Sequence, residues 1–139
     1  SEHNYADNTD MVWNYDAGND TEAIKVTFSD DCDLGPYLYY SERGIYDSEE
    51  LTQEVVDAIE KNGYYEKGDA VYITDDYGPE KYTERTLAGE TMYLFGNHFE
   101  IRLVSDSSDT FYGFKIVDIE KEFKINMNLF KYQFVKIDE

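Results

Sequence analysis

The chain has only one cysteine, two prolines and few basic residues among its 139 positions. A single cysteine excludes an internal disulfide, a Cys-x-x-C pair and a zinc-binding cysteine cluster. No apolar run approaches the ~20 residues of a membrane-spanning helix, so we expect no membrane insertion. The two histidines, His3 and His98, have no neighbouring serine or cysteine in a nucleophile motif. We therefore expect no catalytic residues and a protein that is not an enzyme.

Acidic residues dominate the chain. Its 31 aspartates and glutamates against 12 lysines and arginines give a net charge of −19, and residues 1–114 hold all of this excess. Such a surface repels nucleic acid and anionic lipid, and it attracts metal cations or partners with exposed Lys or Arg. Most of these acids need no role beyond solubility. With 41% apolar residues, the chain is expected to fold as a single domain over residues 1–139.

Short alternating runs separated by turn residues indicate an all-β protein. In Ala23–Phe28, for example, apolar Ile24 and Val26 alternate with polar neighbours, as in a half-buried strand. Many short strands with regular turns favour a jelly-roll β-sandwich. The expected strands are 11–15, 23–28, 69–74, 91–95, 99–104 and 113–119, with a last pair at 123–126 and 132–137.

One segment has the period of a helix instead. Asp47 or Ser48 can serve as its N-cap, and apolar residues then follow at four-residue spacing up to a glycine stop at Gly63. The pattern predicts one amphipathic helix, about residues 48–62, inserted in a long connection between two strands.

Carboxylates at strand ends are the best candidates for a site. Asp106 lies in a short loop after one strand, and Asp69 opens another, shortly after Glu66. If these strand ends lie together, the three carboxylates repel one another unless a Ca²⁺ ion binds among them. Three separate, solvated loop acids are the alternative.

Several motifs, taken in order, resemble one known family. They are His3-Asn4-Tyr5 through Trp13, the Ala23–Ser29 strand, Asp69-Ala70-Val71-Tyr72-Ile73-Thr74-Asp75, Leu87-Ala88-Gly89, and Val104-Ser105-Asp106-Ser107-Ser108 followed by Tyr112-Gly113-Phe114. With them, residues 1–119 resemble a CUB domain, in the disulfide-free form of bacterial extracellular proteins. The resemblance implies a jelly-roll fold, an extracellular location, either secreted or on the cell surface, and binding of other proteins.

The same resemblance implies a calcium site. By position, the family's ligands correspond to Glu66, Asp69 and Asp106, with backbone oxygens near Ser108 completing the shell. Asp30, Asp31 or Asp33 are alternatives to Glu66. In CUB domains with this metal, a basic side chain of a protein partner often contacts the acidic ligands, so we expect a partner with exposed Lys or Arg.

The chain also departs from the family. The four family cysteines are absent, and residues 35–65, which include the predicted helix, look like an insertion. Residues 120–139 form a C-terminal extension that could add strands or begin the next module of a larger multidomain chain.

Two functions remain open. The first is a non-catalytic interaction or adhesion module that binds Ca²⁺ and a protein partner. The second is a carbohydrate-binding module attached to a larger secreted enzyme, because aromatic rings can stack on the faces of sugars. Trp13 is interpreted as a core residue. The possible ligand face then consists of Tyr39, Tyr40, Tyr64 and Tyr65, which flank the predicted helix.

Overall fold

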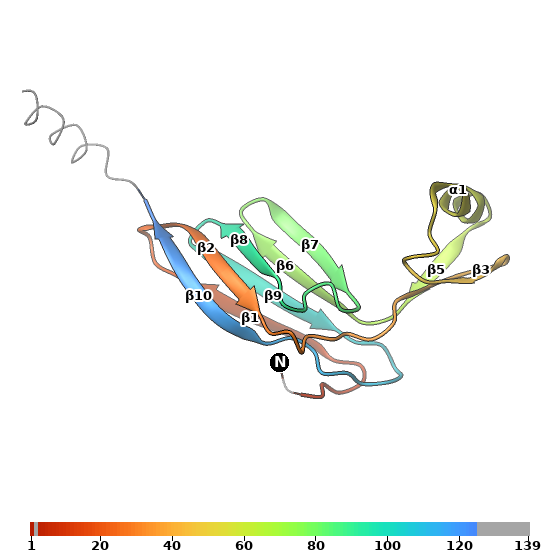
Figure 1. Ribbon diagram of the computed structural model, residues 1–139, viewed down its shortest axis with the longest axis horizontal. Helices are drawn as coiled ribbons and strands as arrows, with labels where there is room; N and C mark the ends of the chain where they lie inside the picture. The colour runs from red at the N-terminus through yellow and green to blue at the C-terminus, as the bar shows by residue number, and fades with distance from the viewer. Residues whose placement is uncertain (2, 125–139) are drawn as a thin grey trace, which may run out of the picture.

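The computed structural model describes residues 1 and 3–124 and contains two sheets that pack face to face (Figure 1). The first sheet has the order β1-β9-β6-β7, with β1 Asp10–Asp16, β9 His98–Val104, β6 Ala70–Asp75 and β7 Gly78–Thr83. The second has the order β10-β2-β8, with β10 Ile116–Phe123, β2 Thr21–Phe28 and β8 Thr91–Phe95. Together these seven strands are called the sandwich below.

The core of the sandwich consists of the inward side chains of its strands. Successive side chains of a strand point to opposite faces, so every second residue of β2 and β9 enters the core. Ile24, Val26 and Leu103 are almost inaccessible to solvent, and Ile73 of β6 lies with them. Trp13 is partly buried against this core and meets the ring of Phe114 edge-on at 5.2 Å, which confirms its interpretation as a core residue.

A third, smaller sheet projects from one end of the sandwich (Figure 1). Its order is β4-β3-β5, with β3 Leu38–Ser41, β4 Gly44–Tyr46 and β5 Tyr64–Lys67, and the helix α1, Gln53–Asn62, connects β4 to β5. These three strands are called the small sheet below. The fold class predicted from the sequence is confirmed as an all-β sandwich with one helix.

The helix begins later than its sequence pattern predicted. Thr52, rather than Asp47 or Ser48, is the N-cap, and its side chain accepts a hydrogen bond from the Val55 amide. Asp47 and Glu50 instead form a separate turn, in which each side chain accepts a hydrogen bond from the other residue's backbone N–H. A pair of acids that resembles a helix start is therefore satisfied in a turn before the helix.

Four strands were not expected, namely β3, β4, β5 and β7. β7 lies at a sheet edge, where Pro79 and exposed charged residues are tolerated, so it lacks an alternating apolar pattern. The expected strand 132–137 and residues 125–126 of the expected strand 123–126 lie outside the described residues, and Phe123 is the last residue of β10. None of the described residues, 1 and 3–124, belongs to a helix long and apolar enough to cross a membrane.

Candidate functional site

The register of the first sheet brings Asp69 and Asp106 together. Ala70, the first residue of β6, pairs with Val104, the last residue of β9. Asp69 and Asp106 are therefore neighbours just beyond the paired ends of two adjacent strands. The condition on which the predicted carboxylate cluster depended, that these two strand ends lie together, is therefore met for Asp69 and Asp106.

Asp69 is a buried carboxylate, with 2% of its surface exposed. One of its oxygens accepts a hydrogen bond from the Tyr5 hydroxyl, and the other accepts one from the Asp106 backbone N–H at 2.8 Å. Burial raises the pKa of Asp69, and the nearby charge of Asp106 raises it further, while the two hydrogen bonds oppose this effect. The structure thus holds two acidic side chains close together at a place where ionising both is unfavourable.

The N-terminal segment fixes the loop that carries Asp106. The Ser105 hydroxyl donates to the Ala6 carbonyl and accepts from the Thr9 amide, both at 2.7 Å. The Asn8 amide donates to the Asp106 carbonyl at 2.8 Å. Burial and the adjacent Asp69 carboxylate raise the pKa of Tyr5, so its hydroxyl stays protonated and remains a donor. The sequence contains no local signal for these contacts, because they join residues almost a hundred positions apart.

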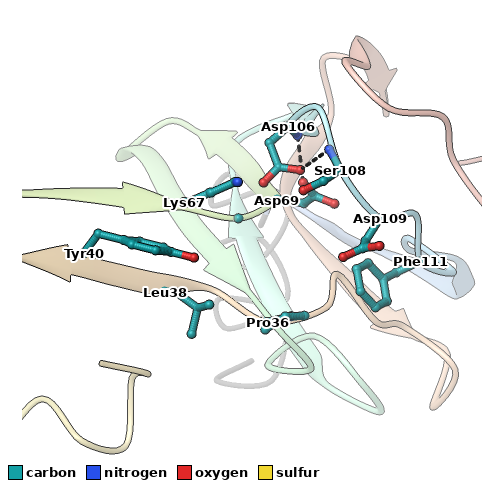
Figure 2. Close-up of a pocket in the computed structure, with 10 residues that line it drawn as sticks. Pro36, Leu38, Tyr40, Lys67, Asp69, Asp106, Ser108, Asp109 and Phe111 are labelled. Atoms are coloured by element: carbon teal, nitrogen blue, oxygen red, sulfur yellow. Dashed lines mark hydrogen bonds between the residues drawn. The ribbon is translucent and has the colours of Figure 1, made fainter. Parts of the chain in front are cut away.

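Asp69 and Asp106 open into a pocket of about 210 Å³, called the carboxylate pocket below (Figure 2). It lies where the sandwich meets the small sheet. Its lining residues are Pro36, Leu38, Tyr40, Lys67, Gly68, Asp69, Asp106, Ser108, Asp109 and Phe111. Among these described residues, three are acidic and Lys67 alone is basic. One wall is therefore acidic, and Leu38, Tyr40 and Phe111 supply apolar and aromatic surface.

The predicted metal ligands are only partly brought together. Asp69, Asp106 and Ser108 line the carboxylate pocket, and the Ser108 amide donates to an oxygen of Asp106 at 3.1 Å. Glu66 does not line it: Glu66 lies on β5 opposite Tyr39, on the face of the small sheet away from Lys67. The structure separates it because residues 64–67 are a strand rather than part of the metal-binding loop that the resemblance implied.

The alternatives to Glu66 lie elsewhere too. Asp30, Asp31 and Asp33 follow β2 and are not among the pocket residues. Asp33 accepts a hydrogen bond from the Gly35 amide and lies 3.6 Å from the guanidinium of Arg85. Asp109, which was not predicted, is the third acidic residue of the pocket.

The donor set fits a calcium ion only in part. Ca²⁺ takes six to eight oxygen ligands, and affinity falls as fewer carboxylates are fixed in place. Within residues 1 and 3–124, no group of three or more His, Cys, Asp or Glu side chains is arranged to hold a metal ion. The chain offers Asp69, Asp106, the Ser108 hydroxyl and backbone carbonyls, a set suited to a weak site.

The tyrosines divide between the two faces of the small sheet. Tyr40 and Tyr65 are directly opposite in the register, and their rings are nearly parallel with centroids 5.1 Å apart. On the other face, Tyr39 lies 6.1 Å from Tyr64, measured between ring centroids. The four predicted tyrosines therefore form two pairs on opposite faces rather than one ligand face. The Tyr40–Tyr65 pair is the one on the side of the carboxylate pocket, because Tyr40 lines it.

No protein-family model matches the chain, and no curated protein matches its sequence significantly.

Proposed function

We propose that this protein is a non-catalytic, CUB-like interaction module that binds a cation, Ca²⁺, in the carboxylate pocket. The observation that carries the proposal is the buried Asp69 carboxylate, which lies beside the partly exposed Asp106 at the end of the sandwich. A cation between them would relieve their repulsion and favour the ionised form of Asp69. The net charge of −19 adds a long-range attraction for cations.

Each residue has a defined part in this proposal. Asp69 and Asp106 supply carboxylate oxygens, and Ser108 supplies its hydroxyl or backbone oxygen. Tyr5 holds Asp69 in position through its hydroxyl. With so few fixed carboxylates, we expect an affinity in the weak range of extracellular calcium modules, a Kd of about 10⁻⁴ to 10⁻³ M.

The proposed setting is extracellular, where calcium at such concentrations is present, and the chain would act within a larger multidomain protein. Its partner would be a molecule that presents a positively charged group to the acidic wall of the carboxylate pocket. A protein with exposed Lys or Arg meets that requirement.

Titration calorimetry with CaCl₂, compared with MgCl₂, tests the proposal. We expect calcium to bind the wild type and not Asp106→Ala, with the variant keeping the wild-type far-UV circular dichroism spectrum. Asp118→Ala is the matched control: Asp118 is exposed on β10, so its loss removes one charge outside the pocket. Unchanged calcium affinity in Asp106→Ala would contradict the proposal, as would an equal loss in Asp118→Ala.

Carbohydrate binding is the second candidate, and the parallel Tyr40–Tyr65 pair beside the pocket favours it.

A further inference from the structure

One face of the small sheet carries a row of three apolar or aromatic side chains, of which the outer two are exposed. Tyr40 of β3 is opposite Ile45 of β4 on one side and opposite Tyr65 of β5 on the other. Ile45 is 55% exposed and Tyr65 is 63% exposed. Because directly opposite residues share a face of the sheet, the three side chains form one continuous strip, called the exposed row below.

The exposed row leads into the carboxylate pocket. Two residues along the strands from the Tyr40–Tyr65 pair, Leu38 and Lys67 form the next pair on the same face. Both of these residues and Tyr40 line the pocket (Figure 2). A ligand that lies on Tyr65 and extends along β3 and β5 past Leu38 and Lys67 therefore enters the pocket that Asp106 and Asp109 line.

The stacked rings restrict the shape of this ligand. Tyr40 covers one side of Tyr65, and the high exposure of Tyr65 leaves aromatic surface open to solvent. An aromatic face binds flat, weakly polar groups such as another ring, the CH face of a pyranose sugar or a planar base. Nucleic acid is excluded by its charge, because its phosphates would face a chain with a net charge of −19.

The pocket restricts the charge of the ligand. Three carboxylates against one lysine favour a positively charged group and oppose the carboxylates and sulfates of acidic glycans. Aromatic rings also attract cations: the ammonium group of Lys81 on β7 lies 4.3 Å from the centre of the Tyr37 ring and donates a hydrogen bond to the Tyr37 hydroxyl. An ammonium group near Tyr40 and Asp106 would be favoured by both effects.

We propose that the exposed row and the carboxylate pocket together bind an amino-sugar glycan, with a pyranose ring on Tyr65 and a free ammonium group at Asp106 and Asp109. This inference rests on the proposed function, since it assumes that the pocket accepts positive charge, and it names the class of partner. Ca²⁺ and the ammonium group compete for the same carboxylates, so the glycan binds more tightly in EDTA than in calcium.

Titration calorimetry with a fully deacetylated glucosamine hexasaccharide, at physiological ionic strength and in EDTA, tests this inference. We expect Tyr65→Ala to weaken binding about tenfold, because it removes the stacking surface. Tyr64→Ala is the matched control, since Tyr64 is also exposed on β5 but lies on the other face. Its affinity should equal that of the wild type.

Two further probes separate the sugar ring from the charge. The fully N-acetylated hexasaccharide keeps the ring and lacks the ammonium groups, and we expect it to bind about tenfold more weakly, because it loses charge-assisted hydrogen bonds. Hexalysine keeps the charge and lacks the ring. Its binding should be weaker than that of the glucosamine hexasaccharide and insensitive to Tyr65→Ala.

Three results would overturn the inference: no binding of the glucosamine hexasaccharide, equal binding of its N-acetylated form, or hexalysine binding as tight as that of the sugar. The last would assign the pocket to a basic peptide. If the protein binds Ca²⁺ but not the sugar, only the glycan inference is contradicted. If it binds the sugar but not Ca²⁺, only the proposed metal site is contradicted, so the two failures are distinguishable.

Discussion

The sandwich and the small sheet are built from similar strands but are stabilised differently. The main hydrophobic cluster draws on β2, β6, β8 and β9 and on the loops next to them, and none of its residues comes from residues 38–67. The small sheet carries ring contacts between tyrosines and, in the connection between β4 and β5, the buried Ile59 of α1. Buried apolar contacts are therefore concentrated in the sandwich, whereas the small sheet leaves Ile45, Tyr64 and Tyr65 exposed.

The carboxylate pocket lies where the two regions join. Gly68 links β5 to Asp69 with a φ of +156°, and a Cβ at this position would lie 2.8 Å from the Pro36 carbonyl oxygen and 2.7 Å from the Tyr37 ring. Only glycine permits the two connecting segments to approach so closely. The junction thus places the exposed row of the small sheet against the acidic end of the sandwich.

The largest difference between the regions should appear on truncation of buried side chains. Leu103→Ala opens a cavity between the two sheets, so the free energy of unfolding should fall by about 2–5 kcal/mol. Ile59→Ala removes a side chain that is just as buried, 2% exposed, but outside the main core. Its effect on the cooperative urea transition should be clearly smaller. Equal effects would show that the small sheet and the sandwich unfold as one unit.

Tyr5→Phe tests how the N-terminal segment supports the acidic end of the sandwich. The variant leaves an oxygen of the buried Asp69 without its hydroxyl donor, which should cost about 1–3 kcal/mol. Urea unfolding measures the loss, and calorimetry should show weaker calcium binding as well. Unchanged stability together with unchanged calcium affinity would mean that Asp69 does not depend on Tyr5.

The pH dependence of stability should distinguish Asp69 from the solvated acids of the surface. Its folded pKa is raised above the unfolded value of about 3.9, so folded protein holds this proton more tightly than unfolded protein. The resulting stability is fully present below the unfolded pKa and is lost as the pH rises through the folded pKa. Asp69→Asn has no carboxyl group to titrate at this position, so its stability does not contain this pH-dependent contribution. The free energy of unfolding of Asp69→Asn, relative to that of the wild type, should therefore increase as the pH rises through the folded pKa of Asp69.

Urea unfolding in EDTA, from about pH 4 to pH 7, measures this difference at each pH. Glu80→Gln, which removes an exposed carboxyl on β7, is the matched control for the loss of one negative charge. If Asp69→Asn shows a constant difference from the wild type, Asp69 has the ordinary pKa of a surface acid.

The smallest effect on the sandwich is expected from removing the small sheet. Replacing residues 38–67 by a short Gly-Ser linker deletes no residue of the main core. The loop-closure entropy changes by only about 0.6 kcal/mol for each halving of the loop length, so the sandwich should still fold with nearly native stability. Circular dichroism melting checks this, and a variant that fails to fold would show that the small sheet supports the core.

The sandwich was largely predictable from the sequence, whereas the small sheet was not. Residues 23–28 and 99–104 alternate because one face of each strand is buried, and residues 91–95 form the strand that was expected. β3 and β5 contain tyrosines on both faces, and neither strand has one buried and one exposed face. Apolar and polar residues therefore do not alternate along their sequences. The only local signals were the high strand preference of tyrosine and the short turn before Gly44.

The candidate site was predictable only where the strand register determines it. Asp69 and Asp106 could be paired because each is next to a strand with a clear pattern. Glu66 was placed by resemblance alone, and the strand β5 carries it away from the pocket. Tyr5 and Asp109 were missed because only the three-dimensional fold brings them to Asp69 and to the pocket.

Hydrogen–deuterium exchange with and without calcium tests the central claim most directly: a stable sandwich presents the cation site, and the small sheet beside it contributes little to stability. We predict slow exchange in β2, β6 and β9 and much faster exchange in β3, β4 and β5. Added calcium should slow exchange at residues 69–71 and 104–109 in the wild type and not in Asp106→Ala. Exchange in the small sheet as slow as in β6, or calcium protection that persists in Asp106→Ala, would contradict this account.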